Sequence, residues 1–232
     1  NNCCCGLPPW SYGDIENTKV LAEKNLKIFA EAEVDVIVTD CSSCASFLKE
    51  YKKVYADDPE KLERIEQISS KIRDVVEFIY TSKFGADEEK KQEVVDSYHD
   101  AHAGTEAVQE VVAKDGKAVV TYHDPCHAVR GQGIKSESRE ILNSLPNVEF
   151  REMAEADWCC GGAGSYALTH YDLSQKVLDR KIDNLKKTDA DILVTSCPAC
   201  MIQLAWGIRK HGLNTRVFHI SEMTAYKESV TA

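Results

Sequence analysis

No run of about 18 or more apolar residues occurs in the 232-residue sequence, so we predict that no segment spans a membrane. Basic residues are few, because 28 lysines and arginines stand against 38 aspartates and glutamates. The resulting net charge of −10 is opposite to the basic surface of a nucleic-acid-binding protein. The sequence also lacks low-complexity blocks, a P-loop, a dinucleotide-binding fingerprint and a Ser-His-Asp order. The residues that carry the function are therefore of another kind.

Cysteine, in contrast, is abundant, with ten residues at positions 3, 4, 5, 41, 44, 126, 159, 160, 197 and 200. Most of them are direct neighbours or form C-x-x-C pairs. A secreted disulfide scaffold is normally shorter and spreads its cysteines between loops. Adjacent cysteines bridge each other only with strain, because a disulfide requires a particular Cα separation. We therefore interpret these cysteines as metal ligands of a protein in the reducing cytoplasm.

One unit of the sequence occurs twice. The first copy begins with C-C-G at positions 4–6 and continues to V-D-V-I-V-T-D-C-S-S-C at positions 34–44. The second copy begins with C-C-G at positions 159–161 and continues to A-D-I-L-V-T-S-C-P-A-C at positions 190–200. The C-C pair and the C-x-x-C pair are separated by nearly the same length in both copies, so a one-residue gap aligns them. The chain is thus predicted to contain two similar tandem units.

Each copy shows the same alternation of patterns. Helices are predicted over residues 14–32 and 172–187, and each begins at an aspartate that can cap exposed N–H groups. Short apolar segments at residues 36–38, 192–194 and 118–122 are typical of the fully buried strands of parallel sheets. Each strand leads directly into cysteines and a further helix. The pattern predicts an α/β fold with mainly parallel sheets and cysteine ligands at the carboxyl ends of strands, where such folds bind ligands.

The repeat also predicts the domain organisation. We expect a first unit at residues 1–80, a helical connector at 81–116 whose charged run is solvated, and a second unit at 117–232. Beyond the C-x-x-C pairs, we align residues 75–79 with residues 217–220, which are similarly apolar.

The second unit offers five candidate ligands, namely Cys126, Cys159, Cys160, Cys197 and Cys200. Zinc takes four ligands in a tetrahedron, and a four-iron cluster also takes four thiolates, so one thiol is left over. A C-x-x-C pair between a strand and a helix is suited to an anionic cluster, because helix N-terminal N–H groups stabilise negative charge. Gly161 and Gly162 let the backbone approach inorganic sulfide closely, since no Cβ atom intervenes.

The spacing C-x32-C-C-x36-C-x-x-C, with glycine after the C-C pair, resembles the cysteine-rich CCG domain family. Its members include the B and D subunits of heterodisulfide reductase and the iron–sulfur subunits of glycolate and lactate oxidation systems. The resemblance covers nearly the whole chain, as two tandem copies. Residues 123–127, 159–162 and 196–204 are especially similar to the glycolate and lactate branch.

The resemblance implies a non-cubane [4Fe-4S] cluster in the second unit, in which one sulfur bridges irons. For the first unit it implies a second [4Fe-4S] cluster or zinc, held by Cys4, Cys5, Cys41 and Cys44. The leading cysteine of the family pattern should lie well before residue 1. Either the protein extends upstream, which we expect, or the first site works with four thiols and Cys3 as a substitute.

The implied function is that of an iron–sulfur electron-transfer subunit of a multi-subunit oxidoreductase. Its partners would be a flavoprotein, ferredoxin-like iron–sulfur subunits, or both, in the cytoplasm or held peripherally at the inner face of a membrane. Two alternatives stay open, a catalytic disulfide reductase subunit and a structural zinc protein. His127 and Arg130 are candidates for a catalytic role beside Cys126, whereas His123 and Asp124 are expected to close their loop through local hydrogen bonds.

Overall fold

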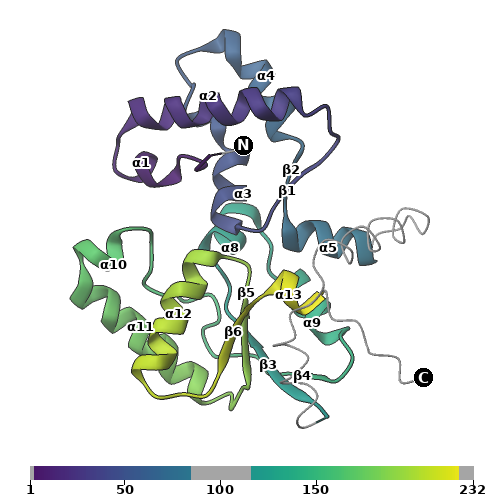
Figure 1. The fold of residues 1–232 in the computed structure, drawn as a ribbon, viewed down its shortest axis with the longest axis vertical. Helices are drawn as coiled ribbons and strands as arrows, with labels where there is room; N and C mark the ends of the chain where they lie inside the picture. The colour runs from purple at the N-terminus through teal and green to yellow at the C-terminus, as the bar shows by residue number, and fades with distance from the viewer. Residues whose placement is uncertain (1–2, 85–115, 225–232) are drawn as a thin grey trace. The chain divides into compact units, whose positions relative to one another are not determined.

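The computed structural model describes residues 3–84 and 116–224, which fall into two compact units, Asn1–Val75 and Val76–Ala232 (Figure 1). Within the described part, all strand pairs are parallel and helices separate consecutive strands along the chain. This arrangement confirms the predicted α/β class. Most of the predicted connector at 81–116, including its charged run, lies outside the described residues.

The first unit is built around a small parallel sheet. Its elements are α1 (Leu7–Ser11), α2 (Ile15–Glu31), β1 (Ile37–Thr39), α3 (Ser42–Lys49), the 3-10 helix η1 (Tyr51–Lys53), α4 (Pro59–Ser69) and β2 (Ile72–Asp74). Strand β1 pairs with β2, with Ile37 opposite Ile72. As predicted, Asp14 caps α2, because its side chain accepts a hydrogen bond from the Asn17 N–H at 3.1 Å.

A buried aromatic and aliphatic core connects the helices of this unit to its cysteine loop. The core includes Leu26, Phe47, Tyr51, Tyr55, Ile65 and Ile72. The Tyr51 hydroxyl donates a hydrogen bond to the Cys5 carbonyl oxygen at 2.6 Å. Burial of this phenol raises its pKa, so it remains a donor at neutral pH. The backbone that carries the first cysteines is therefore anchored to the core.

The prediction of a fully buried strand at residues 36–38 is wrong. Val36 is 41% exposed and Val38 is 39% exposed, although the strand itself forms as Ile37–Thr39. Among the described residues β1 pairs with β2 alone, at one of its two edges. A strand is fully buried only when neighbours cover it, so an apolar triplet indicates a strand more reliably than it indicates burial.

The second unit contains a larger parallel sheet. Its elements are α5 (Val75–Phe84), which spans the boundary between the units, then β3 (Ala118–Tyr122), α8 (Cys126–Gln132), α9 (Glu137–Asn143), β4 (Val148–Phe150), α10 (Tyr166–Thr169), α11 (Tyr171–Lys186), β5 (Ile192–Thr195), α12 (Pro198–Lys210), β6 (Arg216–His219) and α13 (Ile220–Thr224). The strand order is β4-β3-β5-β6. In Figure 1, α11 and α12 cover one face of this sheet, and α9 and α13 the other.

The central position of β5 explains why its side chains are buried along the whole strand. Helix α12 starts directly after β5 and packs on α11 through Gly207, where a Cβ atom would lie 2.8 Å from Ile182 Cγ1. The close helix pair holds the first turn of α12 at the carboxyl edge of the sheet. That turn carries Cys200.

Two further predictions need correction. Helix α11 begins after His170, so Asp172 lies in its first turn and is not its cap. Residues 75–79 form the start of α5, whereas residues 217–220 belong mainly to β6, so the two do not correspond. The repeat instead matches β2 and α5 with β6 and α13, because in both places a strand passes directly into a helix. Short apolar runs do not distinguish these two elements.

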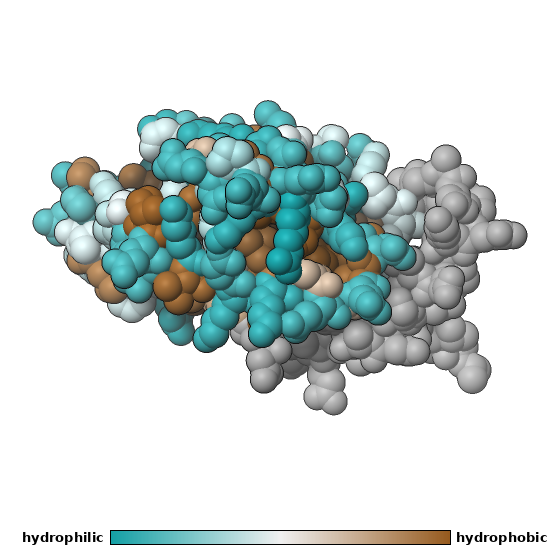
Figure 2. Space-filling model, turned by 90° about the horizontal axis from the view of Figure 1, so that it is seen from above, coloured by the Kyte–Doolittle hydropathy of each residue, from teal (hydrophilic) through white to brown (hydrophobic). Residues whose placement is uncertain are grey.

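Hydrophilic side chains predominate on the face shown in Figure 2, in keeping with the 28% of charged residues. No helix in the described ranges is long and apolar enough to span a membrane.

Candidate metal centre

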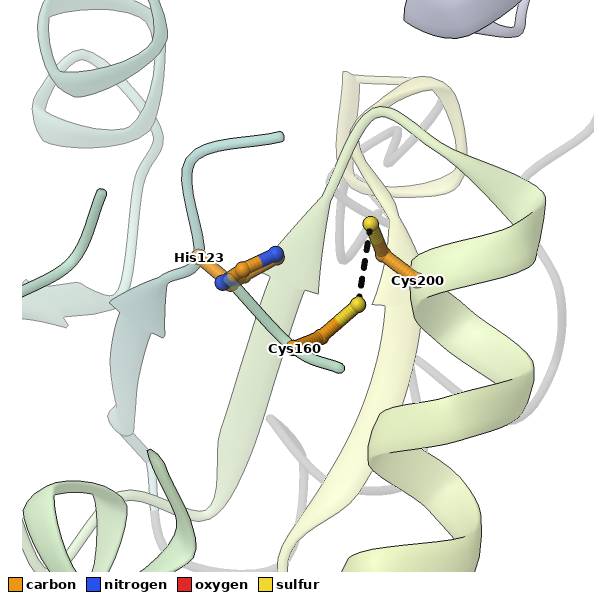
Figure 3. A group of neighbouring side chains, drawn as sticks. All are labelled: His123, Cys160 and Cys200. Atoms are coloured by element: carbon orange, nitrogen blue, oxygen red, sulfur yellow. Dashed lines mark hydrogen bonds between the residues drawn. The ribbon is translucent and has the colours of Figure 1, made fainter. Parts of the chain in front are cut away.

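The structure brings the five thiols of the second unit together beside the carboxyl ends of β3 and β5. Cys126 starts α8, Cys197 caps α12 and Cys200 lies in the first turn of α12. The Sγ atoms of Cys160 and Cys200 are 3.5 Å apart (Figure 3). Three cysteines are buried (Cys160, Cys197 and Cys200), and Cys126 and Cys159 are half-buried.

Hydrogen bonds between these thiols shift their pKa values in opposite directions. Cys160 forms hydrogen bonds with the thiols of Cys159 and Cys200, and this lowers the pKa of Cys160 well below its usual value. The same hydrogen bonds raise the pKa values of Cys159 and Cys200. Burial raises the pKa of Cys126, with a further contribution from the charges of Cys160 and Cys197. Of Cys126, Cys159, Cys160 and Cys200, only Cys160 has a lowered pKa, and a bound cation would displace the protons held by its neighbours.

Glycine gives the C-C-G turn its shape. Gly161 has φ of 84°, and a Cβ atom there would lie 2.6 Å from the Ser174 carbonyl oxygen on α11. The turn directs the N–H of Gly161 to Cys159 Sγ at 3.3 Å and the N–H of Gly162 to Cys160 Sγ at 3.5 Å. Both predicted glycines therefore supply hydrogen-bond donors to thiol sulfurs, in addition to leaving space.

Helix α11 anchors the loop that precedes the cysteine pair. The buried Lys181 ammonium donates hydrogen bonds to the carbonyl oxygens of Glu155, at 2.5 Å, and Ala156, at 3.0 Å. Burial lowers the pKa of Lys181 to about 8. The Arg180 guanidinium pairs with the Glu155 carboxylate and lies over the Trp158 ring, 4.2 Å from its centroid. These contacts fix Cys159 and Cys160 relative to α11.

An ion pair and a hydrogen bond at Asp124 join the loop after β3 to the loop that precedes the cysteine pair. Asp124 is buried and forms a bidentate ion pair with Arg139, at 2.7 and 2.8 Å. Arg139 also pairs with Glu152, and the Asp124 N–H donates to the Ala156 carbonyl oxygen at 3.0 Å. The predicted local closure by Asp124 is therefore replaced by contacts with residues far along the chain.

The interpretation of His123 as a residue that closes its loop is wrong. Its side chain is fully buried, and neither ring nitrogen has a hydrogen-bond partner among the described residues. A ring nitrogen of His123 and the sulfurs of Cys160 and Cys200 all lie within 4.8 Å of one another (Figure 3). The available signal was its position, since it directly follows a buried strand at the ligand-binding edge of a parallel sheet.

The two predicted catalytic candidates lie beside Cys126. Nδ1 of His127 is 3.7 Å from Cys126 Sγ. Arg130 is exposed one turn further along α8, and its charge favours the Cys126 thiolate. Both residues are thus on the more open side of the thiol group, where they could act on a reactant that approaches Cys126.

The first unit repeats this arrangement with four thiols. Cys4 and Cys44 hydrogen-bond to Cys5, and the bond from Cys44 is the main reason why the pKa of Cys5 falls to about 7. Cys41 and Cys5 in turn raise the pKa of Cys44. Cys3 faces elsewhere, since its Sγ atom lies 3.7 Å from the Leu21 carbonyl oxygen and 3.6 Å from Asn25 Oδ1.

The donor sets suit a soft metal. Thiolates select zinc or iron–sulfur clusters and are poor ligands for magnesium or calcium. A tetrahedral zinc ion would satisfy the four thiols of the first unit. In the second unit it would leave one thiol and the imidazole over, so this larger set fits a centre with more than one metal atom.

Comparison with known proteins agrees with this interpretation. The sequence profile of the cysteine-rich domain family, CCG, matches residues 1–49 and 120–205. The chain is 32% identical, over 222 residues, to a probable glycolate oxidase iron-sulfur subunit of Bacillus subtilis, covering 95% of this chain and 45% of that protein. It is 28% identical, over 221 residues, to one of the subunits of fumarate reductase (CoM/CoB) of Methanothermobacter marburgensis, and the match covers 95% of this chain and 37% of that protein.

Lactate utilization protein A of Bacillus cytotoxicus is 27% identical over 220 residues, which are 95% of this chain and 81% of that protein. The chain thus spans less than half the length of the first two relatives. The segments matched by the profile make up more than half of the chain and contain all ten cysteines, so this chain belongs to the cysteine-rich CCG domain family.

Proposed function

We propose that this chain is an iron–sulfur electron-transfer subunit of a multi-subunit oxidoreductase. The observation that carries the proposal is the convergence of five thiols at one sheet edge, three of them buried. Two relatives, a probable glycolate oxidase iron-sulfur subunit and a lactate utilization protein, support the same function.

The second unit would hold a [4Fe-4S] cluster, of the non-cubane type that the fifth thiol favours. Such a cluster supplies reversible one-electron transfer. The chain's own part is to bind and orient it through Cys126, Cys159, Cys160, Cys197 and Cys200. The N–H groups of Gly161 and Gly162 already donate to two of these sulfurs, and the burial of three cysteines limits the access of water.

The first unit would hold a second [4Fe-4S] cluster or zinc between Cys4, Cys5, Cys41 and Cys44. We favour a redox centre with a potential of its own, because Cys4 is exposed and only Cys5 is buried in the first unit, whereas three thiols are buried in the second. Solvent exposure is one of the factors that set the potential of a cluster.

Electrons would come from a partner flavoprotein that oxidises a 2-hydroxy acid or a similar donor, directly or through ferredoxin-like iron–sulfur subunits. The relatives named as subunits support an assembly of several subunits, without identifying the partners. We place the assembly in the cytoplasm, with any membrane association made through partner subunits.

A catalytic disulfide reductase subunit is the second candidate. The half-buried Cys126, beside His127 and the exposed Arg130, is the thiol that a disulfide substrate reaches most easily. The fumarate reductase (CoM/CoB) relative shows that similar chains occur in reductases, which supports this second candidate.

Metal analysis of anaerobically purified protein tests the proposal. We expect iron and acid-labile sulfide, with a paramagnetic signal in one redox state. About two zinc ions and no iron per chain would leave only a structural zinc protein. Addition of thiols to the oxidised sample separates the two redox functions, because a new paramagnetic signal is expected only for a catalytic centre.

A further inference from the structure

The position of His123 is set by the backbone of the sheet. It follows β3 directly, and its N–H donates to the Val194 carbonyl oxygen at 2.9 Å, which extends the β3–β5 ladder by one residue. The ring is held at the sheet edge and points toward Cys160 (Figure 3). Because β3 and the loop after it are buried, the ring has little freedom to turn away.

Burial leaves the imidazole without a well-formed hydrogen bond. Neither ring nitrogen meets the geometry of a hydrogen bond with a described residue, although Cys160 is close enough to interact with the ring, and the side chain has no exposed surface. A buried polar group of this kind destabilises a fold unless a partner outside the polypeptide satisfies it. The sulfurs of Cys160 and Cys200 lie within 4.8 Å of a ring nitrogen.

A comparison with His219 shows that the situation of His123 is specific. His219 is also buried at the end of a strand of the same sheet, and its Nε2 atom is likewise without a hydrogen-bond partner, but its Nδ1 atom is 2.7 Å from the Ser221 hydroxyl. It lies on β6, two strands from β3 and hence about 10 Å away across the sheet. Only His123 adjoins the thiols among the buried histidines of the described chain.

We propose that the His123 imidazole donates an N–H···S hydrogen bond to Cys160 in the metal-loaded centre and so acts as a positioning residue that raises the reduction potential. Donation is favoured over ligation because five thiols already exceed the needs of a four-iron cluster. Cys160 is the acceptor because the ring points toward its sulfur and a ring nitrogen lies within 4.8 Å of it. A donor to the sulfur stabilises the more negative, reduced state. The inference rests on the proposed iron–sulfur function.

The test compares His123→Leu, which removes the donor at similar volume, with His123→Gln and His123→Asn, which keep an amide N–H. His219→Leu is the matched control for the loss of a buried histidine. Redox titration of the loaded protein should show a lower midpoint potential for His123→Leu than for the wild type. We expect the equilibrium constant for reduction to fall about tenfold, which is about 59 mV for one electron. The control should keep the wild-type potential, and at least one amide variant should restore it.

Electron spin-echo spectroscopy gives an independent readout. The wild-type centre should show a weak nitrogen coupling and an exchangeable proton, and His123→Leu should lose both. A strong coupling, as from a directly bound nitrogen, would show a ligand instead of a donor. An unchanged spectrum and potential in His123→Leu would overturn the inference while leaving the iron–sulfur function intact.

Stability separates this role from a purely structural one. In the metal-free chain, His123→Leu should keep or raise the melting temperature, because two unsatisfied buried nitrogens are removed. In the loaded chain it should lower the melting temperature. A fall of equal size in both forms would mean that the histidine only supports the fold.

If the wild type holds zinc and no iron, the proposed function fails and the hydrogen bond can still be tested. Cobalt would then replace zinc, and a shift of the thiolate-to-cobalt charge-transfer band is expected for His123→Leu but not for His219→Leu. An unshifted band would refute the hydrogen bond itself.

Discussion

The two thiol sites of this protein share a design and differ in their surroundings. In both, the N–H of the glycine in C-C-G donates to the first cysteine of the pair, Gly6 to Cys4 at 3.5 Å and Gly161 to Cys159 at 3.3 Å. In both, the second cysteine of the pair has a lowered pKa, to which hydrogen bonding by a C-x-x-C thiol contributes. The local chemistry of the motif is therefore a property of the repeat.

The described residues of the two sites differ mainly in one segment. The second unit has β3 and the loop after it, which supply the fifth thiol of Cys126, the ion pair at Asp124 and the imidazole of His123. The described part of the first unit has no counterpart to this segment, and there β1 is half-exposed. Among the described residues, β3, the three loop residues after it and Cys126 therefore give the second site a fifth thiol and an imidazole.

The largest expected effect is the loss of one centre without the other. Cys160→Ser or Cys197→Ser should abolish the second centre, because each removes a buried ligand that the remaining thiols cannot replace. Cys3→Ser should leave both centres in place, since its sulfur faces Asn25. Iron and sulfide content with paramagnetic resonance measures the result. Equal iron in all three variants would contradict the ligand assignment.

The equivalent glycines give a sharper comparison of the two turns. Gly161→Ala should lower the free energy of unfolding by about 3–4 kcal/mol, because it combines a left-handed backbone with a Cβ atom 2.6 Å from the Ser174 oxygen. Gly6→Ala has the strained backbone but a nearest contact of 3.4 Å, so about 1–2 kcal/mol is expected. Denaturant unfolding measures both.

Gly133→Ala is the control for these variants, since its φ is 74° and a Cβ atom there meets nothing within 4 Å. It should cost about 1 kcal/mol from backbone strain alone. If Gly161→Ala were no worse than Gly133→Ala, close packing of the turn on α11 would not matter to stability.

The buried lysine makes the second unit sensitive to pH. Burial lowers the pKa of Lys181 from 10.5 to about 8, so the folded state releases this proton before the unfolded state does. The unfolded chain then binds more protons between about pH 8 and 10.5, and stability from this group rises with pH across that window. Lys181→Met should remove on the order of 2 kcal/mol of this rise. Denaturant unfolding near pH 8 and near pH 10.5 measures this rise in the free energy of unfolding. Lys186→Met, at the half-exposed Lys186, is the control. An equal rise in the wild type and both variants would refute the prediction.

Local patterns explain which parts of this fold are predictable. The strand at residues 118–122 forms as Ala118–Tyr122, because its run of apolar and β-branched residues suits a buried strand between neighbours. The internal repeat and the parallel sheets also follow from the sequence, since the motif spacing requires a helical crossover between strands.

The features that sequence reasoning missed depend on partners far along the chain. Asp124 is held by Arg139 and Ala156, and His123 meets Cys160 and Cys200, so adjacent residues gave no sign of either contact. The exposure of β1 depends on how many strands flank it, which its own residues do not encode. Convergence of the thiols was easier to predict, because parallel strands bring their carboxyl ends to one edge.

The smallest expected effect compares equivalent valines in the two sheets. Val38 of β1 is 39% exposed, whereas Val194 of β5 is fully buried. Val194→Ala should lower the free energy of unfolding by about 2 kcal/mol, because it leaves a cavity in a closed core, and Val38→Ala by less than about 1 kcal/mol. Denaturant unfolding of the full chain measures the difference. Equal losses would mean that β1 is covered in solution, and that the two sheets differ less than their exposed areas indicate.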